Sequence, residues 1–176
     1  MKTALLPLLA LLALAQCKKK SNPDPVAQLP PATQTGANTF GCLVNGRPWT
    51  PQGFDGSLNL SASYDRTYRQ GTFSLAAYRY ENGARTRQGI GVFSDSMRSA
   101  GRYRMRVGGH HGGSFTDGSQ TCVYRSLDLN GYCRGELVMT RFDEAAGIFS
   151  GTFAFTLANP GCDTIRVTAG RFDYKF

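Results

Sequence analysis

The sequence predicts an all-β domain, an antiparallel β-sandwich or barrel of about nine or ten short strands. Three observations lead to this fold class. Apolar and polar residues alternate along several segments, most clearly in residues 102–107, where three arginines alternate with Tyr, Met and Val. Turn sequences such as Asn-Gly separate these segments at short intervals. No segment after residue 39 has the 3.6-residue repeat of an amphipathic helix.

The expected strands run from residue 40 to the end of the chain. Asn45-Gly46 predicts a tight hairpin between strands at 40–45 and 47–50, because Asn-Gly is the strongest two-residue turn signal. In the final strand, Asp173 is expected to face outward with the other polar residues. The remaining strands are expected at 57–64, 70–80, 87–94, 102–107, 122–129, 132–142, 148–157, 163–168 and 171–176.

The N-terminal residues predict a signal for export. Lys2 precedes an apolar run that ends at Ala15, and Cys17 follows almost directly, with three lysines at 18–20 after it. The run is shorter than the about 20 apolar residues that span a bilayer, and it suits the core of a signal peptide. The pattern is similar to the bacterial lipobox, in which a peptidase cuts before a cysteine that carries diacylglycerol. We therefore expect lipidation of Cys17 and a cell-envelope location, in the outer membrane and facing the periplasm or the surface.

The chain divides into three parts on this interpretation. Residues 1–16 are the lipoprotein signal peptide, and residues 17–38 are a lipid-anchored tether. The tether holds four prolines and few large apolar residues, so we expect it to be extended and without a core of its own. Residues 39–176 are long enough for one ordinary domain with a hydrophobic core.

The net charge of the β domain limits the kinds of binding partner that we expect. Residues 39–176 carry sixteen basic and eleven acidic side chains, a net charge of +5. Outside the cytoplasm we expect no nucleic acid, and the partners are the membrane through the lipid anchor and envelope glycans, lipopolysaccharide or another envelope protein. Arg102, Arg104 and Arg106 share one face of a strand at a spacing of about 6.8 Å. They are candidate ligands for a polyanion, although a solvated strand face is the simpler interpretation.

Other candidate binding residues are few. His110 and His111 are the only histidines, and adjacent residues point apart in an extended chain, so we expect a flexible loop at 108–113 and no metal. Asp143 and Glu144 are expected to be solvated turn residues. Trp49 suits either stacking on a sugar ring or closing one end of the core. No nucleophile-elbow motif is present, and the sequence predicts neither an enzyme nor a cofactor.

Four segments carry a resemblance to a known group of proteins. They are residues 29–36, residues 39–49 (Thr-Phe-Gly-Cys-Leu-Val-Asn-Gly-Arg-Pro-Trp), residues 150–155 (Ser-Gly-Thr-Phe-Ala-Phe) and residues 170–173 (Gly-Arg-Phe-Asp). The chain resembles the small envelope lipoproteins of unknown function of Bacteroidota, which consist of a lipobox, a short tether and one β domain. The resemblance implies an envelope location and an all-β domain, and it supplies no catalytic residues.

Four cysteines remain for disulfides once Cys17 carries lipid, and they allow three pairings. Cys122 and Cys133 flank a local loop, so a bridge between them is expected. Cys42 and Cys162 would then join the beginning of the domain to its end, a pairing that also suits the resemblance.

We expect a binding or structural role from this chain. One alternative is a hollow barrel that carries a small apolar ligand, as lipocalins do. Another is a carbohydrate-binding accessory module. A large internal cavity would favour the carrier, and an exposed Trp49 with flanking tyrosines would favour the carbohydrate module.

Overall fold

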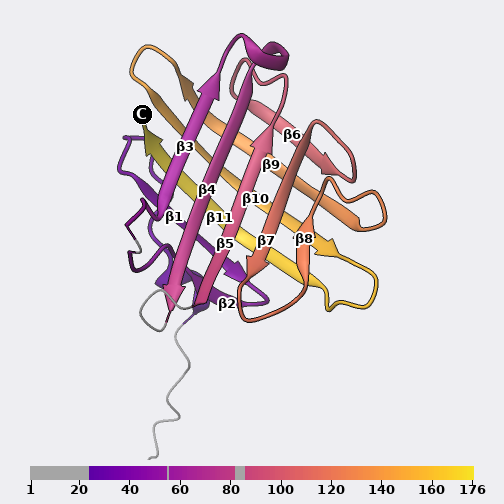
Figure 1. Ribbon diagram of the computed structural model, residues 1–176. Coiled ribbons are helices and arrows are strands. Elements are labelled where there is room, and N and C mark those ends of the chain that lie inside the picture. Colours follow the sequence, from indigo (N-terminus) through magenta and orange to yellow (C-terminus); the bar gives the residue numbers. More distant parts are fainter. Residues whose placement is uncertain (1–23, 55, 82–85) are drawn as a thin grey trace, which may run out of the picture.

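The computed structural model describes residues 24–54, 56–81 and 86–176. The signal peptide and the lipidation expected at Cys17 lie outside these residues. The described chain forms two antiparallel sheets that pack face to face, and it confirms the predicted sandwich rather than a closed barrel. The strands of one sheet cross those of the other at a steep angle (Figure 1).

The first sheet, sheet A, has six strands in the order β2-β1-β11-β10-β9-β6. Its strands are β1 (Thr39–Val44), β2 (Arg47–Trp49), β6 (Gly101–Arg106), β9 (Tyr132–Asp143), β10 (Ile148–Ala158) and β11 (Ile165–Lys175). The β1–β2 hairpin turns at Asn45-Gly46 as expected, and both residues have positive φ angles, 48° and 79°.

The second sheet, sheet B, has five strands in the order β3-β4-β5-β7-β8. Its strands are β3 (Leu60–Asp65), β4 (Thr72–Glu81), β5 (Thr86–Ser94), β7 (His111–Asp117) and β8 (Val123–Arg125). Two short 3₁₀ turns complete the described chain, η2 (Pro25–Gln28) and η3 (Tyr68–Gln70).

The space between the sheets is filled by side chains of both. Phe73 of sheet B stacks on Phe172 of sheet A with ring centroids 5.7 Å apart, and Phe142 stacks on Phe149 at 4.5 Å. Fully buried Leu, Ile, Val and Met side chains surround these rings. Of the two interiors considered from the sequence, packed or hollow, this arrangement favours the packed one.

The expectation of a flexible loop at 108–113 was wrong for residues 111–113, because they begin strand β7. Two glycines are required there by packing. A Cβ on Gly112 would lie 2.6 Å from the Phe93 ring, and one on Gly113 would lie 2.7 Å from the Phe155 ring. The glycines therefore make room for aromatic side chains, and the strand continues through them.

Other strand boundaries also differ from the expectation. Residues 163–168 and 171–176 form one strand, β11, with an irregular register against both of its neighbours and a positive φ of 50° at Ala169. The strand expected at 122–129 is only β8, and the one expected at 57–64 begins at Leu60.

The second half of the expected tether is not free of the domain. Residues 29–37, which we call the N-terminal strap, lie against the outer face of sheet A, and Leu29 is buried. Arg141 and Arg171 of sheet A donate hydrogen bonds to carbonyl groups of the strap. Gly41 of β1 permits the close approach, since a Cβ there would lie 2.6 Å from Pro30.

The expected disulfide pairing was also wrong. Cys122 bonds to Cys162, while Cys42 and Cys133 are free thiols buried in the core. Strand order explains the difference. Cys42 and Cys133 lie on strands of sheet A that β11 and β10 separate, whereas Cys122 precedes β8 and Cys162 lies in the β10–β11 loop.

Candidate anion-binding surface

Five arginines gather on the outer face of sheet A, the face that points away from sheet B. The alternation along β6, β9 and β11 places their side chains there, while the intervening residues enter the core. All five are exposed, which confirms the exposure expected for the three on β6. We call this group the arginine surface: Arg102, Arg104, Arg106, Arg134 and Arg166.

The register of the strands brings like charges together. Arg106 of β6 lies directly opposite Arg134 of β9. Continuing across the sheet, Arg134 lies opposite Thr156, and Thr156 lies opposite Arg166. Directly opposite residues on one face are about 5 Å apart, and like charges in such pairs destabilise a sheet. The row therefore concentrates positive charge at a cost to the fold.

Few carboxylates compensate this charge within the described part of sheet A. Glu136 lies opposite Arg104, but its carboxylate pairs with Arg102 at 2.6 Å. The other two carboxylates on this face lie toward its opposite end. Asp143 pairs with Arg141 at 2.7 Å, and Asp173 is buried beneath the N-terminal strap.

A shallow groove follows the arginine surface between β6 and β9. Its lining includes Arg104, Arg106, Tyr132, Arg134 and Glu136. Tyr132, which is 49% exposed, contributes an aromatic ring to the groove at the first residue of β9. The sequence pattern identified the arginines of β6, but Tyr132 and Arg134 joined the candidate site only through the pairing of β6 with β9.

Trp49 is a core residue at the edge of a groove that Arg79 and Gln88 also line. It is buried, packs edge-on against Phe40, and lies beneath the guanidinium of Arg79, 5.3 Å from the ring centroid. Its indole Nε1 donates a hydrogen bond to Gln88, and the Gln88 amide donates one to Asp117. The contacts correspond to the core role considered for Trp49 and leave no ring face for a sugar.

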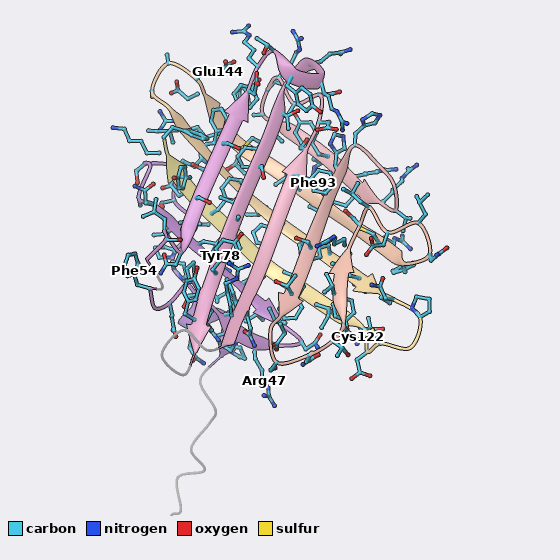
Figure 2. The ribbon with its side chains drawn as sticks, in the orientation of Figure 1. Arg47, Phe54, Tyr78, Phe93, Cys122 and Glu144 are labelled. Carbon is cyan, nitrogen blue, oxygen red and sulfur yellow. A yellow bond between two sulfur atoms is a disulfide. The ribbon has the colours of Figure 1, made fainter. Side chains whose placement is uncertain are left out.

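The aromatic residues on the outer face of sheet B include Tyr78 and Phe93 (Figure 2). Their rings lie on glycines of the neighbouring strands, Tyr78 on Gly89 and Phe93 on Gly112. Arg87 covers the Tyr78 ring at 4.7 Å. The rings therefore stabilise glycine-containing strands, and both also line a groove on this face.

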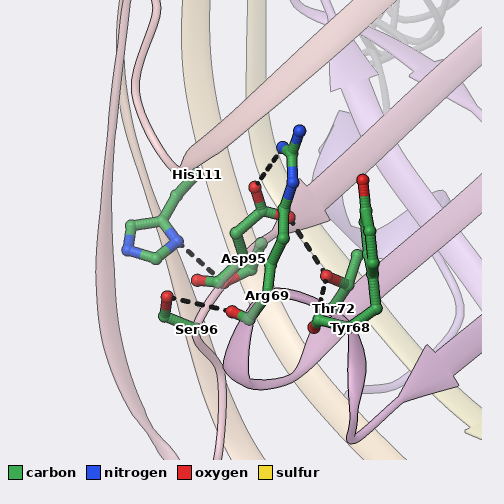
Figure 3. Close-up of polar contacts among 7 residues, drawn as sticks. Tyr68, Arg69, Thr72, Asp95, Ser96 and His111 are labelled. Carbon is green, nitrogen blue, oxygen red and sulfur yellow. Dashed lines mark hydrogen bonds and ion pairs between the residues drawn. The ribbon is translucent and has the colours of Figure 1, made fainter.

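The two histidines have different surroundings. His110 is exposed, whereas His111 is half-buried, and its Nδ1 lies 2.7 Å from the Ser94 hydroxyl on the paired strand (Figure 3). Asp95 follows Ser94 and pairs with Arg69 at 2.9 Å. Ser94 is fully buried, so its hydroxyl cannot reach a substrate, and the hydrogen bond joins β5 to β7.

The acidic pair of the β9–β10 turn is engaged in ion pairs rather than in a site. Besides the contact of Asp143 with Arg141, Glu144 lies 3.6 Å from Arg66. Among the residues that the structure describes, no group of three or more His, Cys, Asp or Glu side chains could hold a metal ion.

Searches for similar proteins returned no match among family models, curated proteins or solved structures. Within the described ranges, no helix has the length and hydrophobicity needed to cross a membrane.

Proposed function

We propose that this protein is a lipid-anchored component of the cell envelope that acts by binding, and that its arginine surface holds an anionic partner rich in phosphate or carboxylate groups. One observation carries the binding role. Arg106 and Arg134 are placed directly opposite each other, and among the residues that the structure describes no acidic side chain forms a salt bridge with either. An anion between the two guanidiniums would remove their repulsion and accept charge-assisted hydrogen bonds from both.

The N-terminal strap supports an action close to the membrane. Since residues 24–38 belong to the described domain, only residues 18–23 separate it from the expected lipid on Cys17. Seven Cα–Cα steps reach at most about 25 Å. A domain held this near the bilayer meets the phosphates of lipids and of envelope glycans at high local concentration.

Binding of a soluble polyanion tests the proposal. The variant Arg104→Gln/Arg106→Gln/Arg134→Gln should bind dextran sulfate at least about tenfold more weakly than the parent at low salt, and the difference should shrink at high salt. All three side chains are exposed, so the variant should lose less than about 1 kcal/mol of unfolding free energy.

A matched control separates this surface from net charge. Arg66→Gln/Arg87→Gln/Arg98→Gln removes three exposed arginines that belong to sheet B or its loops. This variant should bind like the parent. Equal losses in the two variants would mean that binding reflects net charge alone, and no loss in either would refute the proposed site.

A further inference from the structure

An exposed apolar loop lies beside the arginine surface. It connects β8 to β9 over residues 126–131, and Leu127 and Leu129 within it are 56% and 78% exposed. Tyr132, the first residue of β9, adds a half-exposed ring. Two leucines and a tyrosine are thus exposed within six consecutive residues, and clustered exposed apolar side chains mark interaction sites.

The loop is held in this conformation by its backbone. Asp128 and Gly131 donate hydrogen bonds within the loop, at 3.1 Å to Arg125 and 2.9 Å to Asp128. Gly108 of the β6–β7 turn donates another to the Ser126 carbonyl at 2.8 Å. The Cys122–Cys162 disulfide lies just before β8 and ties this region to the β10–β11 loop. The leucines are thus presented outward by an ordered loop.

Apolar and basic groups are continuous across this part of the molecule. Tyr132 and Arg134 are successive outward residues of β9, and Arg106 lies opposite Arg134. Leucine and tyrosine side chains enter the boundary between lipid headgroups and acyl chains, while arginines attract anionic headgroups. A soluble polyanion would use the arginines and gain nothing from the leucines.

We infer that the partner of the arginine surface is the anionic face of a lipid bilayer, into which the 126–131 loop inserts Leu127 and Leu129. The inference rests on the proposed function, because it names the partner of the same surface. It adds a second contact with the membrane, independent of the lipid on Cys17.

The position of the strap is consistent with this orientation. The strap and the arginine surface share the outer face of sheet A, the strap covering the end of β11 around Asp173 and the arginines lying on β6, at the start of β9 and at the start of β11. A domain lying with this face toward the bilayer has its tether and its basic residues on the same side.

An environment-sensitive fluorophore tests the insertion directly. In the full chain carrying Cys17→Ser, Leu129→Cys supplies a reactive thiol, because Cys42 and Cys133 are buried in the folded protein. A nitrobenzoxadiazole label at position 129 should shift to the blue with vesicles of phosphatidylglycerol and phosphatidylcholine in equal parts, and not with phosphatidylcholine alone. The same label on Leu58→Cys should not respond, since Leu58 lies next to β3, at the opposite edge of sheet B from β8.

Vesicle sedimentation measures the contribution of the leucines. In the Cys17→Ser chain, Leu127→Ser/Leu129→Ser should lower the partition coefficient for the phosphatidylglycerol vesicles by about tenfold or more. Phe54→Ser/Leu58→Ser is the matched control, because both side chains are at least 70% exposed and precede β3. The control should partition like the parent.

The outcomes separate this inference from the proposed function. If position 129 gives no shift, or the leucine variant partitions like the parent, while dextran sulfate still requires the arginines, the membrane is not the partner and the anion-binding surface stands. If the arginine variant changes neither vesicle nor dextran sulfate binding, both fail. If the leucine variant also loses dextran sulfate binding, the loop supports the surface structurally and the insertion is refuted.

Discussion

Asp173 joins the N-terminal strap to the sandwich through one carboxylate. Its oxygens accept hydrogen bonds from the hydroxyls of Ser150 and Thr33, both at 2.7 Å, and from the backbone N–H groups of Thr35, Gly36 and Ala37 at 2.8–3.1 Å. Burial raises the pKa of Asp173, but these donors more than offset it and hold the pKa well below its usual range. The charged carboxylate is therefore part of the folded structure.

Replacing Asp173 should loosen the strap. Asp173→Asn removes the negative charge that the donors stabilise, and we expect a loss of about 3 kcal/mol of unfolding free energy at pH 7. Because the folded pKa is depressed, this stabilisation is complete above the ordinary value of about 3.9 and is lost as pH falls below it. Urea unfolding at pH 7 and pH 3 checks both effects, with Asp163→Asn as an exposed control. Equal pH dependence of parent and Asp173→Asn would contradict the assignment.

His111 predicts a second pH dependence. Its pKa is shifted mainly by burial, whereas the pKa of Asp173 is shifted by hydrogen bonds. Burial and the neighbouring His110 lower the pKa of His111, and they outweigh Asp95, which raises it. Between the ordinary value of about 6.5 and the lower folded value, the unfolded chain binds more protons, so stability is lost as pH falls below about 6.5. The urea midpoint should drop between pH 7.5 and 5.5, and His111→Gln should reduce this drop. His110→Gln should retain most of it, and the reverse result would contradict the assignment to His111.

At the scale of elements, the disulfide joins segments of different sheets. The loop-entropy model gives a stabilisation of about 4 kcal/mol for a bridge over about 40 residues. We therefore expect Cys122→Ser to lower the unfolding free energy by about that amount, and Cys162→Ser to match it. Unfolding in urea measures both. Peptide mapping without reduction should show one linked pair, and a fragment joining Cys42 to Cys162 would contradict the structure.

The two free thiols provide an internal control. Burial raises the pKa of Cys42 to about 12 and that of Cys133 to about 11, so neither is ionised at neutral pH. They should react with a thiol reagent only after unfolding. The two thiols lie on different strands of sheet A and do not face each other. Cys42 lies opposite Trp49, and Cys133 lies opposite Leu157.

At the scale of the whole molecule, two attachments to the membrane would act together. Cys17→Ser should remove the lipid and leave the weaker, salt-sensitive contact of the arginine surface. After cell fractionation, the variant should therefore be released from membranes by a high-salt wash, whereas the parent should remain. Retention of the variant after that wash would contradict lipidation as the main anchor.

The strap brings together residues from distant parts of the chain. Thr33, Thr35 and Gly36 belong to the strap, Ser150 to β10 and Asp173 to β11. These residues meet at one carboxylate. Their spacing along the chain does not reveal the contact, because the strap residues are separated from Asp173 by more than 130 residues.

The alternation of the sequence determined the fold class and the exposure of the arginines on β6, and the Asn45-Gly46 turn determined the first hairpin. These are local properties, since a two-residue period assigns a side chain to one face of a strand whatever its neighbours are. The tertiary structure alone decided the pairing of Arg106 with Arg134, the Cys122–Cys162 bond and the burial of Asp173. Each depends on which distant strands become neighbours, and burial across the whole sandwich selects that order rather than any short stretch of chain.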